Sequence, residues 1–265
     1  MNGEVTEAEI MRRVLYRDAL MLVIDKPAGL PVHPGPRNSL SRSGRAGTQT
    51  LTQFLPALRF GLPRVPELAH RLDRDTSGCL VLGRHRKALE RLGKLFKGNQ
   101  AHKTYWAIVE GGPEAETGEI ELPLAPRDPD RGWWMKVDPA GQPALTRWRV
   151  LGRADGRTWL ALEPVTGRTH QLRVHCSASG FPILGDAVYG HAPRFGGPGL
   201  HLHARAITLP LYPRREPVHV EAPLPAHMAE TFAALGFDAP APSGSDKLPP
   251  VVGTDDDGQE LAGNR

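Results

Sequence analysis

The nine residues from His70 to Gly78 place two carboxylates and two guanidiniums in a short segment directly before an apolar run. Within this segment Asp73 stands between Arg71 and Arg74. A carboxylate that a neighbouring guanidinium keeps ionised can act as a nucleophile when it lies in a cleft. The same charges could instead form a structural salt bridge that clamps a loop to a helix. Spacing alone leaves both interpretations open.

A second dense cluster, from Thr166 to His175, supplies two further guanidiniums, Arg168 and Arg173. We predict a helix over residues 169–179, because the pattern stops at a glycine that suits a helix C-terminus. Within that helix His170 and Arg173 are three residues apart and share one face. A guanidinium on that face could reach the carboxylate of the first cluster.

The histidines near these carboxylates raise the alternative of a metal site in a hydrolase. The candidate ligands are His70, Asp73, His170 and His175, with His201 and His203 as a further pair. However, the chain has no HExxH motif and no Cys/His pairing of the kind that zinc sites use. We therefore expect framework histidines that form hydrogen bonds, and no metal. GxGxxG and GxxxxGK[ST] motifs are absent as well, so no nucleotide cofactor is expected.

The elements that must position these clusters can be predicted from periodicity. One helix is expected over residues 86–96, with leucines at helical spacing. Strands are expected over residues 19–24, 79–82, 103–109, 145–151, 158–162 and 200–209, with residues 145–162 forming a hairpin around Asp155 and Gly156. Because strands outnumber helices and occur in hairpin-like pairs, the fold class is α+β, with a mixed, largely antiparallel sheet and a few helices packed on it.

Tyr105 lies on the strand predicted over residues 103–109. Alternation puts its ring on the same face as Ala107 and Val109, opposite Trp106 and Ile108. It could be a core aromatic whose hydroxyl is hydrogen-bonded, or a ring that stacks on a base. The spacing does not choose between these roles.

The chain is long enough for one large domain or two small ones, and its charge distribution suits a polyanion as partner. Residues 239–265 hold five acids and two bases, which leaves 31 bases and 24 acids in residues 1–238, an excess of seven positive charges. Arginines outnumber lysines 26 to 7, and arginine is the better bidentate ligand for phosphate. Genome composition would also explain that ratio. We expect an N-terminal extension (1–14), a catalytic domain (15–238) and a disordered acidic tail (239–265).

The remaining sequence features concern the cellular compartment, the two cysteines and one irregular segment. No apolar stretch approaches the roughly 20 residues that span a bilayer, and the first ten residues lack a signal core. We therefore expect a cytoplasmic protein without a membrane partner. The two cysteines, Cys79 and Cys176, are expected to be buried thiols. The segment His33 to Gln49 contains three arginines and could be an RNA-facing loop or a solvated insertion.

Taken together, these motifs resemble one family, the RluA-type pseudouridine synthases. The resemblance runs in the family's order over roughly residues 15–225 and rests on residues 25–30 (DKPAGL), 70–78 (HRLDRDTSG), 103–111 (KTYWAIVEG), 167–175 (GRTHQLRVH), 182–186 (PILGD) and 200–204 (LHLHA). It implies a pseudouridine-synthase-like sheet with flanking helices and a central basic cleft. It also implies an isomerase that converts uridine to pseudouridine in RNA without a cofactor.

The resemblance also assigns roles to individual residues. Asp73 falls on the catalytic aspartate, Tyr105 on the active-site tyrosine that stacks under the uracil, and Arg173 on the arginine that pairs with the aspartate. Arg71 falls where some members carry an arginine that helps displace the flipped base. The RNA-binding set is expected to be Arg71, Arg74, Lys103, Arg168 and His170.

One departure concerns the substrate. Many members carry an N-terminal RNA-binding module of the S4 type, and fewer than about 20 residues precede the first motif here, so we expect a stand-alone, monomeric enzyme. Its partner is expected to be structured tRNA or ribosomal RNA. The sequence does not identify the RNA or the uridine. A catalytically inactive RNA-binding or folding protein on the same scaffold is the alternative.

Overall fold

A computed structural model of the chain describes residues 4–34, 49–128 and 134–242. Within these ranges the strands form one ten-stranded sheet and one two-stranded sheet. The main sheet has the order β1 (Val14–Arg17), β2 (Met21–Lys26), β4 (Ser77–Gly83), β11 (Leu202–Leu209), β5 (His102–Glu110), β10 (Arg157–Pro164), β9 (Leu145–Ala154) and β6 (Thr117–Glu121). Strands β3 (Glu67–Leu68) and β12 (Val218–Glu221) pair with β4 and β11, and β7 (Leu124–Pro126) pairs with β8 (Met135–Val137).

The pairing confirms the predicted mixed, largely antiparallel sheet. The central pair β4 and β11 is parallel, and the other ladders among the described residues are antiparallel. Strands β9 and β10 form the predicted hairpin, whose turn residues Asp155 and Gly156 both have positive φ angles. Asparagine, aspartate and glycine tolerate this left-handed conformation, which explains why this turn was readable from the sequence.

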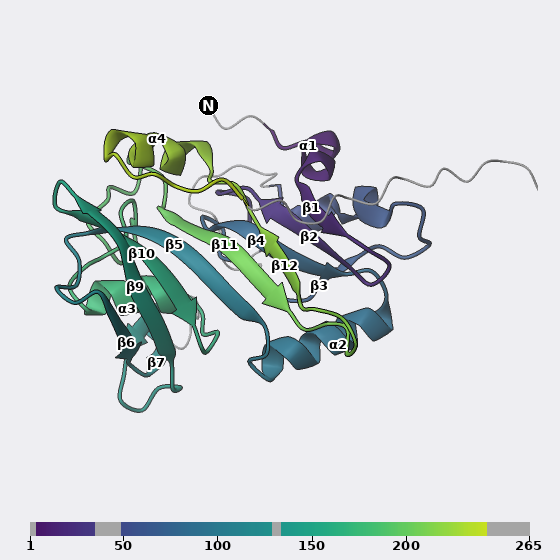
Figure 1. Cartoon of the computed structure of the whole chain (residues 1–265), viewed down its shortest axis with the longest axis horizontal. Coiled ribbons are helices and arrows are strands. Elements are labelled where there is room, and N and C mark those ends of the chain that lie inside the picture. The colour runs from purple at the N-terminus through teal and green to yellow at the C-terminus, as the bar shows by residue number, and fades with distance from the viewer. Residues whose placement is uncertain (1–3, 35–48, 129–133, 243–265) are drawn as a thin grey trace, which may run out of the picture.

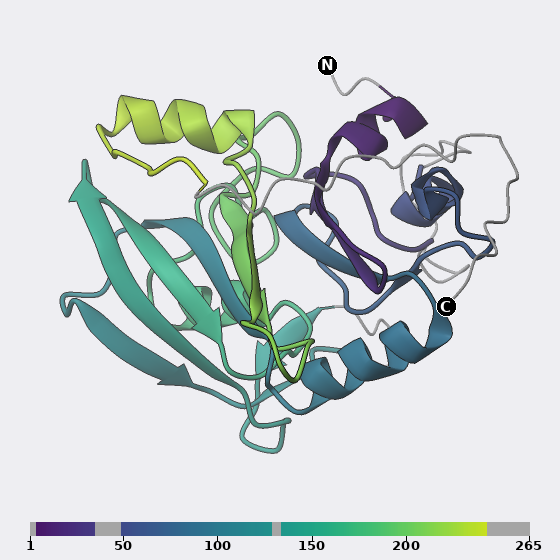
Figure 2. The same cartoon turned by 45° about the vertical axis from the view of Figure 1, so that its right-hand side comes forward.

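The helices cover both halves of the main sheet. They are α1 (Glu7–Arg12), α2 (Arg86–Lys97), α3 (Gln171–Ala178) and α4 (Ala226–Ala234), with short 3-10 helices η1 (Leu51–Gln53) and η2 (Leu55–Arg59). Figures 1 and 2 show α1 and α2 at the half formed by β1, β2 and β4, and α3 and α4 at the half formed by β5, β10 and β9.

Alternation along the strands sorts the core into layers. In β5, Ala107 and Val109 pack in a cluster with α3, whereas Trp106 and Ile108 pack in a cluster with α4. This confirms the two faces predicted for this strand. Because each face packs against a helix, both sets of apolar side chains are buried away from water. This burial is the main term that stabilises such a sheet.

One face of the sheet carries two separate apolar clusters. Leu202 and Ala204 lie two residues apart on β11, so they share a face, yet Leu202 belongs to the cluster with α3 and Ala204 to the cluster with η1 and η2. Tyr105 packs against both clusters. The centre of the sheet is therefore the place where the two packed halves meet.

Several further expectations can be compared with the structure. Cys79 and Cys176 are buried free thiols, as predicted. In the described ranges, no helix is both long enough and apolar enough to cross a membrane. Most of the segment His33 to Gln49 and nearly all of the predicted tail 239–265 lie outside the described residues.

Candidate active site

A cleft of about 280 Å³ lies where the two apolar clusters meet. Ligand pockets are typically roughly 300–1,000 Å³, so this one suits a single nucleoside-sized group. Its charged lining residues are Arg71, Asp73, Lys103, Arg168 and Arg173, and its other lining residues include His70, Phe96, Tyr105, His170, Leu172 and Leu202. Asp73 is the one carboxylate among these lining residues, so the cleft is strongly basic around a single acid.

Asp73 is placed by the loop between β3 and β4. The next residue, Arg74, presents its carbonyl oxygen to Lys26 Nζ at 2.9 Å and to Gly29 N at 2.9 Å. Lys26 Nζ also donates to the carbonyl oxygens of Pro27 and Leu30. All three protons of the ammonium group therefore bind backbone carbonyl oxygens, and the motif that ends β2 holds the loop that carries Asp73.

Lys26 is completely buried, which is rare for a lysine without a carboxylate contact. Burial lowers its pKa to about 7, although the negative charges of Asp75, Asp73 and Asp25 oppose the shift. The loop that holds Asp73 thus depends on an ammonium group that gives up its proton far more easily than an exposed lysine.

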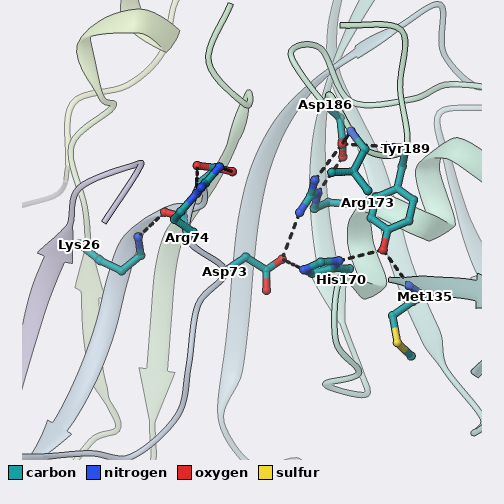
Figure 3. Close-up of polar contacts among 10 residues, drawn as sticks. Lys26, Asp73, Arg74, Met135, His170, Arg173, Asp186 and Tyr189 are labelled. Carbon is teal, nitrogen blue, oxygen red and sulfur yellow. Dashed lines mark hydrogen bonds and ion pairs between the residues drawn. The ribbon is translucent and has the colours of Figure 1, made fainter. Parts of the chain in front are cut away.

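Arg173 meets two carboxylates, as Figure 3 shows. Its Nε and Nη2 donate to Asp186 at 2.7 and 2.8 Å, while its Nη1 lies 3.8 Å from Asp73 Oδ2. The sequence predicted a pairing with Asp73, and the structure adds a closer, bidentate partner. Burial alone would raise the pKa of Asp186, but the hydrogen bonds and charge of Arg173 lower it overall.

His170 is the second group beside Asp73. Its Nε2 lies 3.7 Å from Asp73 Oδ2, and its Nδ1 is 2.8 Å from the hydroxyl of Tyr189. Burial lowers the pKa of His170, partly offset by the charge of Asp73, so the imidazole is neutral at neutral pH. A neutral histidine can donate one hydrogen bond and accept another.

The structure corrects the predicted start of this helix. Helix α3 begins at Gln171, not at residue 169, because His170 has a φ of 52° and stands at the N-cap. The side chain of Gln171 explains the turn, since its Oε1 accepts from Arg168 N and from Thr166 Oγ1. The left-handed backbone at His170 directs its ring toward Asp73 and Tyr189 (Figure 3).

Tyr105 lines the cleft beside Leu202. Its hydroxyl forms no hydrogen bond with the described residues, which argues against the satisfied core aromatic and leaves the ring available for stacking. Burial raises the pKa of Tyr105, and the nearby charge of Asp73 raises it further. The side chain is therefore a neutral phenol at neutral pH.

The predicted RNA-binding residues divide into two groups. Arg71, Lys103, Arg168 and His170 line the cleft. Arg74 does not line it, because its guanidinium turns to the surface and pairs with Asp75 at 3.0 Å. Burial lowers the pKa of Lys103, and none of the described carboxylates forms an ion pair with it.

The other histidines considered as metal ligands, His70, His175, His201 and His203, form hydrogen bonds within the framework. His70 Nε2 accepts from Val81 N, and its ring stacks on Phe96. His175 bonds Thr146 and Leu122, and His203 bonds Ser77 and Ala222. Among the described residues, no group of three or more histidine, cysteine or acidic side chains is arranged to hold a metal ion.

Sequence reasoning missed two residues of the site, Asp186 and Tyr189. Asp186 ends a motif that contributed to the resemblance, yet nothing in its spacing from Arg173 predicted the contact. Tyr189 lies in a loop without periodicity, so only the fold brings its hydroxyl to His170.

Comparisons with known proteins show the family of this chain. Residues 20–178, more than half of the chain, match the family model described as RNA pseudouridylate synthase. The chain is 43% identical over 230 residues to an uncharacterized RNA pseudouridine synthase of Zymomonas mobilis, covering 86% of this chain and 99% of that protein. It is 34% identical to the ribosomal large subunit pseudouridine synthase C of Vibrio cholerae, covering 86% of this chain and 70% of that protein.

Solved structures give the same result. Human RNA pseudouridylate synthase domain containing 4 superposes with a TM-score of 0.72 at 29% identity, covering 88% of this chain and 97% of that one. Human RNA pseudouridylate synthase domain containing 1 superposes with a TM-score of 0.65 at 26% identity, covering 86% and 96% of the two chains.

Proposed function

The chain belongs to the RNA pseudouridine synthase family, and on this premise we propose that Asp73 is the nucleophile with which it isomerises uridine in structured tRNA or ribosomal RNA. The observation that carries the assignment is the position of Asp73. It is the one carboxylate lining a basic cleft, and it faces Arg173 and His170. Its side chain keeps 20% exposure, so a substrate can reach it.

The reaction needs few groups. The bond from N1 to C1′ breaks, the uracil turns, C5 joins C1′, and the proton lost from C5 is balanced by the proton gained at N1. No atom or electron is added overall. Asp73 assists at the ribose, and Arg173 stabilises its negative charge. Because the target atoms are inaccessible in a base stack, the nucleotide must be flipped into the cleft.

Tyr105 and the cationic residues support this step. Because burial keeps the Tyr105 hydroxyl protonated, we assign its ring to stacking under the uracil, before any part in moving the proton at C5. Arg71, Lys103 and Arg168 bind the phosphates around the flipped nucleotide. We assign Arg71, which lines the cleft, to the gap that the flipped base leaves.

A relative supports a ribosomal substrate. The Vibrio cholerae protein is named for the large ribosomal subunit, and it shares 34% identity with this chain. We therefore propose ribosomal RNA as the first substrate to test, with tRNA tested in parallel. The cytoplasmic location and the monomeric state stay predictions.

Substitution of the nucleophile tests the proposal. Asp73→Asn is expected to abolish pseudouridine formation in RNA from cells that lack the gene, while RNA affinity stays within about twofold, because the amide keeps the shape and loses the charge. Asp75→Asn is the matched control, since Asp75 pairs with Arg74 outside the cleft lining, and it should retain activity. Normal turnover by Asp73→Asn would refute the assignment. A wild-type protein that binds RNA without forming pseudouridine would favour the inactive RNA-binding alternative.

A further inference from the structure

We propose that Tyr189 is a positioning residue whose hydroxyl holds His170 in the tautomer that carries its proton on Nε2, so that this N–H faces Asp73. The inference rests on the proposed function, because it adds a residue to the same site. It concerns a side chain that does not line the cleft and that acts through its neighbour.

The direction of two hydrogen bonds sets the tautomer. Met135 N donates to the Tyr189 hydroxyl oxygen at 2.9 Å, and the same oxygen lies 2.8 Å from His170 Nδ1 (Figure 3). A backbone N–H only donates, so the tyrosine oxygen accepts there. Its single proton has no acceptor other than His170 Nδ1 among the described residues, and leaving it without an acceptor would cost free energy. A neutral imidazole that accepts at Nδ1 carries its proton on Nε2.

This tautomer supplies Asp73 with a second donor. His170 Nε2 and Arg173 Nη1 lie 3.7 and 3.8 Å from the same oxygen, Asp73 Oδ2. Figure 3 shows the other carboxylate oxygen outside these two contacts. Both distances exceed a normal hydrogen bond, and such contacts often tighten only when the substrate is bound. The arrangement fixes one oxygen of Asp73 and leaves the other for the ribose.

Asp186 couples the two donors. Its carboxylate accepts from Arg173, and its Oδ1 also accepts from Tyr189 N and Val188 N at 2.9 Å. The guanidinium of Arg173 lies 5.1 Å from the centre of the Tyr189 ring. One buried carboxylate therefore orients the arginine directly and the histidine through Tyr189.

Nitrogen-15 NMR of the histidine side chains tests the tautomer on the full chain without RNA. His170 should show a protonated Nε2 and an unprotonated Nδ1. Two residues calibrate the measurement: His175, whose Nε2 faces the carbonyl oxygen of Leu122, and His70, whose Nε2 accepts from Val81 N and which must carry its proton on Nδ1. A proton on Nδ1 of His170 would overturn the proposal.

Tyr189→Phe then tests the consequence. The variant should lose the single His170 tautomer and form pseudouridine about tenfold more slowly under single-turnover conditions, with RNA affinity within about twofold. Unchanged signals of His70 and His175 will show that the fold is intact. Tyr212→Phe, which removes a hydroxyl that donates to Asp18 away from the cleft, is the matched control and should leave both readouts unchanged.

A Tyr189→Phe variant with the wild-type tautomer and rate would refute the positioning role. The tautomer is measured without RNA, so a negative result there can be told apart from a failure of the proposed function. The latter would appear as a wild-type protein that forms no pseudouridine.

Discussion

At the residue scale, the site separates Asp73, the carboxylate proposed as nucleophile, from Asp186, the carboxylate that holds Arg173. Asp186 is 1% exposed and takes the two short contacts with Arg173, whereas Asp73 is partly exposed and meets the same guanidinium at 3.8 Å. An aspartate locked in a bidentate pair would be a poor nucleophile, because attack would break both bonds. The longer contact leaves Asp73 oriented and accessible for the role we propose for it.

The structural role of Asp186 can be measured as stability. Asp186→Asn should lower the free energy of unfolding by about 3 kcal/mol, because the buried guanidinium of Arg173 loses its closer, bidentate carboxylate partner. Urea unfolding at neutral pH measures the change. Glu119→Gln is the control, since it removes the charge from an exposed pair with Arg147 and should lower the free energy of unfolding far less. Equal small effects of the two substitutions would contradict this division of roles.

At the element scale, the Asp73 loop ends where the parallel strands β4 and β11 approach each other closely. Ala204 pairs with Gly78, and Ser77 Oγ bonds His203 Nδ1 at 2.8 Å. Gly78 has a φ of 104°, and a Cβ there would lie 2.3 Å from the carbonyl oxygen of Ala204. Only a residue without a side chain allows the two strands to approach this closely at the exit of the loop.

Gly78→Ala is therefore expected to cost more stability than a glycine substitution in open space. Gly61 also has a positive φ, 81°, but nothing lies near its missing side chain. Gly61→Ala should lower the free energy of unfolding by about 1 kcal/mol from backbone strain, and Gly78→Ala by about 3 kcal/mol or more, because strain and overlap add. Chemical denaturation of both variants gives the difference. A similar cost at the two positions would show that the close approach is unimportant.

The buried lysine that holds the Asp73 loop should make the free energy of unfolding depend on pH. The folded chain releases the Lys26 proton near pH 7, because burial lowers the pKa of that group to about 7, whereas the unfolded chain keeps it until about 10.5. Between these values the unfolded state binds more protons, so this lysine makes the free energy of unfolding rise with pH, by at most about 1.4 kcal/mol per pH unit. Urea unfolding of wild type and Lys26→Met from pH 7 to 10 measures the difference.

The expected outcome is a smaller rise with pH in Lys26→Met than in the wild type. Lys97→Met, which removes an exposed lysine of α2, controls for the loss of a positive charge. Identical pH profiles of wild type and Lys26→Met would contradict the account of this buried ammonium group.

At the scale of the whole molecule, the cleft carries part of the excess of basic residues. Arg71, Lys103, Arg168 and Arg173 surround one acid there, a local excess of three positive charges beside the seven counted for residues 1–238. Enclosed clefts lined by one sign of charge attract the opposite charge more strongly than a flat surface does. If the proposed function holds, this arrangement attracts the phosphate backbone of RNA to Asp73.

The salt dependence of RNA affinity tests whether the basic residues of the cleft bind the phosphate backbone. Lys103→Ala should weaken RNA binding and reduce the slope of log affinity against log salt by about 1, because one phosphate contact is lost. Filter binding at several salt concentrations measures the slope. Lys136→Ala serves as the control, because Lys136 pairs with Asp138 away from the cleft lining. An unchanged slope in Lys103→Ala would remove this residue from the RNA interface.

The sequence predicted local structure better than the assembly of the site. Alternation around Tyr105 and the turn at Asp155 are encoded by neighbouring residues, so both were readable. The contact of Arg173 with Asp186 and the close approach of Gly78 to Ala204 join segments that are distant or irregular in sequence, and only tertiary packing creates them. The position of Asp73 was predicted because its motif is dense, whereas Tyr189 stands alone in a loop.

Mapping of pseudouridine in cellular RNA tests the central claim most directly. Ribosomal RNA and tRNA should be compared, position by position, between cells with the gene, cells without it, and cells complemented with Asp73→Asn. We predict that specific pseudouridines disappear without the gene, return with the wild-type chain and stay absent with Asp73→Asn. Unchanged pseudouridines after deletion, or their return with Asp73→Asn, would contradict the account.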